Sequence, residues 1–505
     1  MNTALATAWS PDRQDAVPMS DLRRTALAPW YLLLHIGATI LVAGVCATFA
    51  ARVEPSPFTA SVMFTLSVAW ILFSWIRVTG TIASPYWLFV VVASLFNGGQ
   101  AFLEAVGLNT NGVLGGRFSD ATTSATILFS NLSLMLLHLG ALSRRIRGAP
   151  NSPPFDPPQL ERGTIRLGLL LVAIAVVPTF LQLREGLTTV LEGGYFALYQ
   201  REIKTNVGAW QALFSQFMLP GAFLLAAASK HRQAMRYVSL VILMIFAGSY
   251  LFMGYRGAAG AAMVAYAWIW HTRIAKLPVA VSIATGVLIV FGVFPMIRVH
   301  RSAAGEQRLS WNAFLATLDN YDNPAVASVS EMGGSMSTTA YTMDLVPSDR
   351  DFDYGKSYLY ALLAVVPNIF GTPLHPSIAR GTASEWLVRT TSYHTAVRRG
   401  GLGFSFIAES YLNFGWLGPL LIMIPLGYVY VAAESYALRG AAQTALMGVV
   451  LFFSLIFARA ESASISRSIV WCGLMPLAVL SILIPKEAPE YLVGSDTDEG
   501  IPLDA

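Results

Sequence analysis

Residues 277–297, LPVAVSIATGVLIVFGVFPMI, decide the class of fold, because they run for 21 positions without one charged side chain. About 20 apolar residues in a helix are enough to cross the roughly 30 Å hydrocarbon core of a bilayer. The stretch also has no polar face that could turn toward water. It therefore predicts a transmembrane helix.

The chain as a whole has the composition of a membrane protein. Of its 505 residues, 55% are hydrophobic and only 12% are charged, whereas soluble domains carry about 25% charged residues. The net charge of +4 is small for this length and gives no reason to expect nucleic acid as a partner. Cys46 and Cys472 both lie in apolar runs, so neither a structural disulfide nor a thiolate metal site is expected.

Apolar stretches of similar length recur along nearly the whole sequence, and they predict an all-α polytopic membrane protein with about 12 transmembrane helices. The expected spans are residues 30–51, 59–77, 84–105, 121–143, 165–183, 207–229, 235–254, 257–272, 277–297, 408–433, 441–458 and 466–485. The first nine form a membrane bundle over residues 30–297. The last three form a C-terminal group over residues 408–485.

The distribution of Lys and Arg predicts which side of the membrane each loop faces. With both ends of the chain inside, 16 of the 33 Lys and Arg residues fall on the cytoplasmic side and 8 fall in short periplasmic loops. Short cytoplasmic loops are normally the richer in basic residues. We therefore expect a multi-pass protein of the bacterial inner (cytoplasmic) membrane, with residues 1–29 and 486–505 in the cytoplasm.

The one long segment outside the expected spans, residues 298–407, is predicted to be a large periplasmic loop. Loops of this length are usually functional or disordered, and this one is rich in aromatic and turn residues. Its apolar piece SYLYALLAVVPNIFG, residues 357–371, is too short for a span and contains a proline. We expect a short helix there that lies in the interface or re-enters the membrane.

Arginines near the periplasmic ends of the spans are the first candidate site residues. Arg256 lies between two apolar runs in FMGYRGAAG, and Arg298 and Arg301 end the ninth span. Arg459 follows the eleventh. Each of them alone is open to a plain interpretation, in which it reaches the lipid headgroups or pairs with a carboxylate. Their clustering on the side that should be depleted of basic residues favours a functional role.

The densest group of candidates lies in RTTSYHTAVRRGGLGFSFIAESYLNFGWLG, residues 389–418. His394, Arg398 and Arg399 precede a glycine-rich turn, and Glu409 and Asn413 share one face of the helix that follows. A carboxylate beside guanidinium groups suits general-base activation of a hydroxyl next to an anionic leaving group. The alternative is an ion pair between Glu409 and an arginine that only fixes the loop.

Metal and cofactor sites are not expected. Asp349, Asp351 and Asp353 alternate along the chain, but such a run is more often a solvated turn than a cation site. The sequence has no phosphate-binding P-loop, zinc motif or nucleophile elbow. Scattered histidines such as His35 and His138 are expected to be structural or interfacial rather than ligands.

Three stretches resemble the O-antigen polysaccharide polymerases, the Wzy family. GGLGFSFIAESYLNFGWLGPL, residues 400–420, is similar to the signature region of the family. Tyr354-Gly355-Lys356-Ser357-Tyr358 with Val366-Pro367 resembles the pattern ahead of that signature, and FMGYRGAA around Arg256 resembles a mid-chain arginine element. The expected topology, about a dozen spans with one large periplasmic loop, is also similar.

The resemblance implies an enzyme that polymerises undecaprenyl-pyrophosphate-linked oligosaccharide repeat units into O-antigen or a related surface polysaccharide at the periplasmic face. It implies a GT-C-like membrane glycosyltransferase, inverting and metal-independent, without a cofactor. Its partners would be the lipid-linked glycan donor and acceptor and the bilayer, with a chain-length regulator as an open candidate.

The same resemblance implies roles for the candidate residues. Glu409 or His394 would deprotonate the acceptor hydroxyl, while Arg398 and Arg399 would stabilise the departing pyrophosphate. The remaining candidates for binding pyrophosphate or glycan are Arg256, Arg298, Arg301, Tyr354, Tyr411, Asn413 and Arg459.

Two other functions use a similar membrane plan. An O-antigen ligase takes the same donor but transfers the glycan to the lipid A core, and the signature run favours a polymerase over it. A flippase for lipid-linked oligosaccharides would line a central cavity with basic residues, whereas here they gather at the periplasmic rim.

Overall fold

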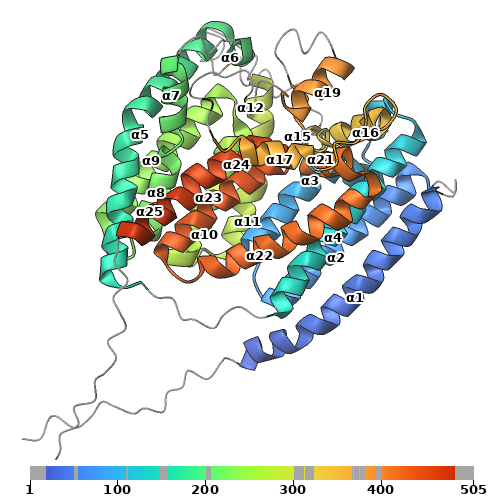
Figure 1. Cartoon of the computed structure of the whole chain (residues 1–505), viewed down its shortest axis with the longest axis horizontal. Coiled ribbons are helices and arrows are strands. Elements are labelled where there is room, and N and C mark those ends of the chain that lie inside the picture. The colour runs from blue at the N-terminus through green and yellow to red at the C-terminus, as the bar shows by residue number, and fades with distance from the viewer. Residues whose placement is uncertain are drawn as a thin grey trace, which may run out of the picture.

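The computed structural model describes residues 19–50, 55–109, 112–147, 156–200, 206–300, 323–366, 381–392 and 401–483, together with residues 312, 368 and 375. Within these ranges every regular element is a helix (Figure 1). The expectation of an all-α polytopic membrane protein is therefore confirmed.

The N-terminal part of the bundle is built from helices of very different lengths. They are α1 (Met19–Ala50), α2 (Pro57–Thr79), α3 (Pro85–Ala105), α4 (Asp120–Ile146), α5 (Pro158–Gly193), α6 (Ala197–Gln200), α7 (Asn206–Ser215), α8 (Met218–Ala227), α9 (Gln233–Met253), α10 (Arg256–Arg273), α11 (Val279–Leu288) and α12 (Phe294–His300), with a 3-10 turn η1 (Val113–Gly116) and a π-helical turn η2 (Ile289–Val293).

Shorter helices follow. Those before the last spans are α15 (Pro324–Gly333), α16 (Met336–Leu345), α17 (Lys356–Leu363), α19 (Ala383–Thr391) and α21 (Phe406–Phe414). The C-terminal part contains η3 (Gly415–Leu417), η4 (Pro419–Met423), α22 (Ile424–Ala437), α23 (Ala441–Phe457), α24 (Ser462–Ile469), η5 (Val470–Leu474) and α25 (Met475–Leu483).

Ten helical segments in the described chain are long and apolar enough to cross a membrane, two fewer than the sequence predicts. The other two predicted spans, residues 257–272 and 441–458, coincide with α10 and α23. The apolar part of α23 is only 17 residues long, and α10 begins with Arg256 and ends with Arg273. These two helices pack against each other and against α8, so protein covers much of their surface.

The structure differs from the predicted span 408–433 at its start, because the helix breaks after α21. Gly415 has a φ of 55°, a left-handed conformation that favours glycine, and a Cβ there would lie 3.1 Å from the ring of Phe352. The apolar segment that can cross the membrane begins at Pro419 and runs to Ala437. Glu409 and Asn413 therefore lie on a separate short helix outside the span.

Helix α4 forms the centre of the N-terminal half of the bundle, with 89% of its apolar window buried. It packs against α1, α2 and α22. Gly140 on α4 and Gly427 on α22 allow the two backbones to touch, because a Cβ at either position would overlap the carbonyl of Ile424 or Leu137 respectively. Glycine is thus required at this crossing.

His35 and His138 meet inside this half of the bundle, with ring centroids 4.7 Å apart. His35 Nδ1 accepts a hydrogen bond from Trp70, and the His138 ring contacts the hydroxyls of Ser74 and Tyr86. Both rings are wholly buried. The contacts agree with the structural role expected for them.

The helices α15, α16, α17, α19 and α21 gather at one end of the bundle (Figure 1). Helix α15 is held against α3 by close backbone contact between Gly99 and Gly333 and by a 2.8 Å hydrogen bond from Gln100 Nε2 to the carbonyl of Ser330. Helix α17 is held against the C-terminal part, since Arg467 donates to the carbonyl of Ala364 at 2.7 Å. These contacts attach α15 and α17 to the helices of the bundle.

The ends of α5, α10 and α23 meet at another place in the bundle. Asp156, just before α5, accepts a hydrogen bond from Arg273 at the end of α10 and one of 2.7 Å from the N–H of Ala441 at the start of α23. The last turn of α4 carries Arg144 and Arg145. Basic residues therefore mark several of these ends.

Helix α11 is unlike the rest of the bundle. Every residue from 278 to 288 is exposed, and only 6% of the apolar window over Val279–Ile297 is buried. The chain contacts the bundle again after α11, where η2 and α12 pack against α15. About three turns of helix are thus exposed on every side in the part of the chain that the structure describes.

Candidate active site

The carboxylate of Glu409 is the centre of a buried polar cluster. Ser405 caps the start of α21 by accepting a 3.0 Å hydrogen bond from the N–H of Ala408, which places Glu409 in the first turn. Its Oε1 accepts from the hydroxyls of Ser357 at 2.8 Å and Ser462 at 2.6 Å, and its Oε2 accepts from the N–H of Ser462 at 2.7 Å. The side chain has no exposed surface. Three helices, α17, α21 and α24, therefore meet at one carboxylate.

Asn413 extends the cluster by one turn of α21. Its Nδ2 donates to Ser357 Oγ at 2.7 Å and to the carbonyl of Glu409 at 2.7 Å, and its Oδ1 accepts from the N–H of Gly355 at 2.9 Å. Because both side chains contact Ser357, Glu409 and Asn413 share one face of the helix. Two of these three hydrogen bonds hold the start of α17, and the third lies within α21.

Burial raises the pKa of Glu409 to about 7, against hydrogen bonds from Ser462 and Ser357 that lower it. The neighbouring Glu461 raises it further. A carboxyl group in such surroundings changes its charge near neutral pH, as general bases and acids often do. Structural carboxylates in buried networks show the same shift, so the pKa alone does not assign a role.

Glu461 is a second buried carboxylate, next to Ser462 in the chain. Its Oε2 accepts from the N–H of Ala383 at 2.9 Å and its Oε1 accepts from the N–H of Ser384 at 3.2 Å. These are the first two helical residues of α19. The sequence shows only a carboxylate after Arg459 at the end of a span, so this contact was missed.

Arg256 belongs to a different group of contacts. Its guanidinium donates to the carbonyl of Phe294 at 2.7 Å and forms a 2.5 Å ion pair with Glu331 on α15. It joins α10 to α12 and α15, whereas Glu409 joins α17, α21 and α24. The side chains of Arg256 and Glu331 keep 15% and 25% of their surface exposed.

Arg459 lies close to the start of α21 through its backbone. Its carbonyl oxygen is 3.6 Å from where a Cβ of Gly403 would lie, and Gly403 has a φ of 74°. Its guanidinium stands 5.4 Å from the ring centroid of Phe96. The structure thus places Arg459 beside the residues that lead into α21.

The two tyrosine candidates face different surroundings. Tyr411 is 8% exposed and packs its ring on Phe129 at 5.2 Å, so it belongs to the core. Tyr354 is 72% exposed and joins the cluster only through its backbone N–H, which donates to the carbonyl of Asn413 at 3.1 Å. Of the two, only Tyr354 presents a ring to the surroundings.

Several predicted residues lie outside what the structure describes. Arg301, His394, Arg398 and Arg399 fall outside the described residues altogether. Arg298 lies on α12, but its side chain is not among those described. The predicted group of basic residues beside Glu409 stays a prediction.

One member of the aspartate run, Asp353, forms an ion pair with an arginine. Asp353 accepts a 2.8 Å hydrogen bond from Arg350, whose guanidinium also stands 4.5 Å from the ring centroid of Trp386. Among the described residues, no group of three or more His, Cys, Asp or Glu could hold a metal ion.

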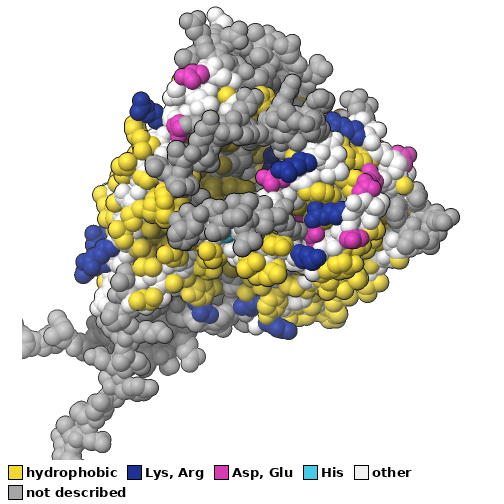
Figure 2. All heavy atoms as spheres, turned by 45° about the horizontal axis from the view of Figure 1, so that its top comes forward, with side chains coloured by type: hydrophobic (Ala, Val, Ile, Leu, Met, Phe, Trp, Pro, Cys, Tyr) yellow, Lys and Arg dark blue, Asp and Glu magenta, His cyan; other side chains and the backbone are white. Residues whose placement is uncertain are grey.

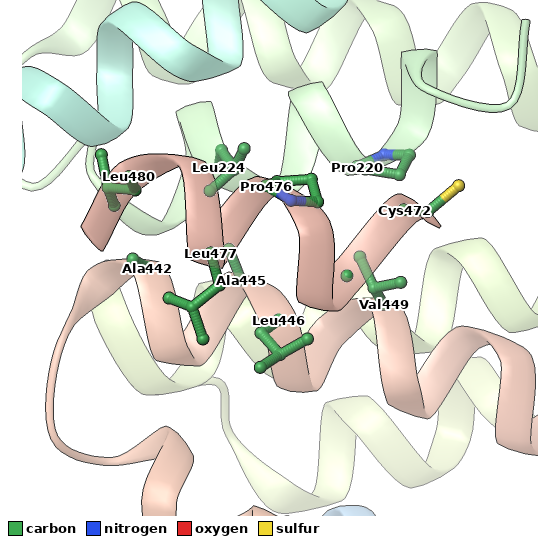
Figure 3. A pocket seen from close by; sticks show the side chains of 11 residues that line it. Pro220, Leu224, Ala442, Ala445, Leu446, Val449, Cys472, Pro476, Leu477 and Leu480 are labelled. Atoms are coloured by element: carbon green, nitrogen blue, oxygen red, sulfur yellow. The ribbon is translucent and has the colours of Figure 1, made fainter. Parts of the chain in front are cut away.

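The surface at this end of the molecule is hollowed near its centre, with basic and acidic side chains close to the hollow (Figure 2). A separate pocket lies between α8, α23 and α25 (Figure 3). Its lining is apolar, with Leu224, Leu446 and Leu477 among the residues that form it. Apart from the thiol of Cys472, the residues that line it carry no titratable group, so the Glu409 cluster remains the better candidate site.

Comparison with known proteins identifies the family. A family model described as O-antigen polysaccharide polymerase Wzy matches residues 32–487. No curated protein and no solved structure matches the chain. The match covers nearly all of the sequence, including the bundle, the loop helices and the Glu409 cluster. The chain is thus a multi-pass membrane protein that belongs to the Wzy family of O-antigen polysaccharide polymerases, which act on lipid-linked repeat units.

Proposed function

We propose that this protein transfers a growing glycan from one undecaprenyl-pyrophosphate carrier to the repeat unit on another, at the periplasmic face of the bacterial inner membrane. The observation that carries the proposal is the family match over residues 32–487. It favours polymerisation over the ligase and flippase alternatives.

The orientation is supported by the charges at the helix ends. Arg77 lies in the last turn of α2, Arg144 and Arg145 in the last turn of α4, and Arg273 in that of α10. Basic ends of this kind normally face the cytoplasm. The helices α15 to α21 would then lie on the periplasmic side, with both chain termini in the cytoplasm.

The reaction needs no nucleotide. A hydroxyl at the non-reducing end of the acceptor attacks the anomeric carbon of the donor, and the bond from that carbon to the pyrophosphate oxygen breaks. The hydroxyl proton passes to a base, and the carrier pyrophosphate leaves with the bonding electrons. Direct displacement inverts the anomeric centre, and arginines supply the positive charge for the leaving group.

Two residues are candidates for the base, Glu409 and His394. The carboxylate of Glu409 has no exposed surface and already accepts three hydrogen bonds, which suits a residue that positions its neighbours. A base must come within hydrogen-bond distance of the proton that it removes. The burial of Glu409 therefore favours His394 as the group that meets the acceptor.

The test is to incubate the purified protein in liposomes with its lipid-linked repeat unit, without nucleotide and with excess EDTA. We expect a ladder of products spaced by one repeat unit. Label transferred to added lipid A core would indicate a ligase instead, and label that crosses the bilayer without lengthening would indicate a flippase.

One substitution tests the basic segment directly. Arg398→Ala should abolish long-chain glycan while the protein stays in the membrane at its normal level. The matched control is Arg389→Ala, which removes an exposed arginine from the last turn of α19. A normal ladder from the Arg398 variant would show that this arginine does not act on the substrate.

A further inference from the structure

The side chain of Glu461 and the N–H of Ser462, at the start of α24, form hydrogen bonds with two other helices instead of with their own. Glu461 occupies the N-cap position of α24, where a side chain normally accepts a hydrogen bond from its own helix, yet it makes no such bond. Its carboxylate instead accepts from the N–H groups of Ala383 and Ser384 on α19. The free N–H of Ser462 at the start of α24 is taken by Glu409 from α21.

The two hydrogen bonds that Glu461 accepts are not needed to cap α19. That helix already has a complete capping box, in which Thr382 accepts from the N–H of Glu385 and Glu385 accepts from the N–H of Thr382. Glu461 is 4% exposed, and a buried carboxylate is costly unless it is hydrogen-bonded. The contact therefore adds a fixed position to a helix that is already capped.

The same two residues tie down both helices. Glu461 holds the start of α19 and its neighbour Ser462 holds the first turn of α21, so one peptide unit sets the distance between them. In sequence, these helices flank residues 393–400, which carry the predicted His394, Arg398 and Arg399.

We propose that Glu461 and Ser462 form a positioning junction for polymerisation, which fixes α19 relative to α21 and its Glu409. The junction does not touch the substrate; it acts through the two helices that it joins. This role rests on the proposed function. Loss of the junction lowers the rate of chemistry in the bound complex more than it weakens binding.

Glu461→Gln is the primary variant, because it keeps the size of the side chain but leaves only one acceptor oxygen for two N–H donors. We expect kcat for lengthening to fall about tenfold or more, with KM for the lipid-linked repeat unit nearly unchanged. Ser462→Thr, which keeps the hydroxyl, should retain more activity than Ser462→Ala. An equal loss from both serine variants would contradict the role of the hydroxyl.

Thr382→Ala is the matched control. It breaks the capping box of α19, at a cost of about 1 kcal/mol to the helix, but leaves the bonds from Glu461 in place. If Glu461 only stabilises α19, the two variants will lose activity to the same extent. If it positions α19, Thr382→Ala will stay close to wild type.

A distance measurement tests the junction without an enzyme assay. Spin labels at Arg389→Cys on α19 and Leu417→Cys, just after α21, occupy exposed positions, and the native Cys46 and Cys472 are buried. We expect Glu461→Gln to broaden the distance distribution and Thr382→Ala to leave it narrow. An unchanged distribution in Glu461→Gln overturns the junction, whereas a wild-type protein that makes no ladder overturns the proposed function and this role with it.

Discussion

Glu409 and Ser462 lie 53 residues apart in the sequence and are joined by two hydrogen bonds, at 2.7 Å from the backbone N–H and at 2.6 Å from the hydroxyl. All three groups donate to the carboxylate in the structure, which is the arrangement that an ionised Glu409 accepts. Protonation would put a donor on one carboxylate oxygen and would require a serine hydroxyl to reverse its hydrogen bond and accept.

Activity should therefore fall as the pH drops through the pKa of Glu409, which burial raises to about 7. Ser462→Ala removes a hydrogen bond that lowers this pKa, so the inflection in the rate profile should move to higher pH. Glu409→Gln should abolish long-chain glycan at a normal membrane level. Glu192→Gln, at an exposed position of α5, is the control and should match the wild type. A Glu409→Gln protein with a normal ladder would exclude any essential role for the carboxylate.

Variants of the Arg256–Glu331 ion pair can show whether Arg256 binds substrate or only joins helices. The two side chains are 15% and 25% exposed and form a 2.5 Å ion pair, so replacing either residue breaks the same contact. If Arg256 binds pyrophosphate, Arg256→Ala should lower kcat/KM about tenfold or more, while Glu331→Gln should leave it near wild type. Equal losses from the two variants and from the double variant would mean that Arg256 only joins α10 to α15.

The hydroxyl of Tyr358 is buried on α17 and finds no hydrogen-bond partner among the described residues. Burial, and then the charge of Glu409, hold the pKa of Tyr358 well above its usual value, so it stays protonated. An unpaired buried hydroxyl costs about 1–3 kcal/mol, and Tyr358→Phe should not lower stability.

Because the Tyr358 hydroxyl is buried like the Glu409 carboxylate, the same variant should leave KM for the repeat unit unchanged, and a several-fold rise in KM would show that the hydroxyl meets a sugar. The measurement is steady-state kinetics alongside thermal unfolding, with Tyr436→Phe near the end of α22 as control. Unchanged KM together with a higher Tm would mean that the hydroxyl has no contact with substrate.

The crossing of α4 and α22 predicts a pure stability effect. A Cβ at Gly427 would overlap the carbonyl of Leu137, and overpacking of this kind costs about 1–3 kcal/mol. Gly427→Ala should lower both Tm and the amount of protein in the membrane. Gly286→Ala on α11 is the control, since nothing lies within 4 Å of its Cβ position. Equal stability of the two variants would show that the backbones are not in contact at this crossing.

Much of the bundle can be predicted from the sequence, because the length and apolarity of a span are local properties. The segment 277–297 shows this plainly, since its apolar run corresponds to Val279–Ile297 in the structure. The break at Gly415 could not be predicted in the same way. Residues on both sides of it are apolar, and a positive φ leaves no mark on hydropathy.

The candidate site was only partly visible in the sequence. The spacing of Glu409 and Asn413 predicts one shared helix face, and both contact Ser357. Ser462 carries no signal of its own, and Ser357 appears only inside the Tyr354–Tyr358 stretch that resembles the family pattern. The two serines lie 53 and 52 residues from Glu409, so nothing in the sequence indicates that they contact it. Glu461 stood out only as a carboxylate at the end of a span, and its partner on α19 depends on the tertiary fold.

Because the surface of α11 is exposed, the thickness of the surrounding bilayer affects how this helix is oriented. The apolar helix over Val279–Ile297 is 19 residues long, or about 28 Å at 1.5 Å per residue, which nearly equals the thickness of the hydrocarbon core. Its first ten residues, α11, are exposed, whereas η2 and α12 pack against α15, so only the α11 half can adjust its tilt to the match between these two lengths. Lipids with shorter or longer acyl chains should therefore change the angle of α11 while the packed helices keep theirs, and a detergent micelle imposes no fixed thickness at all.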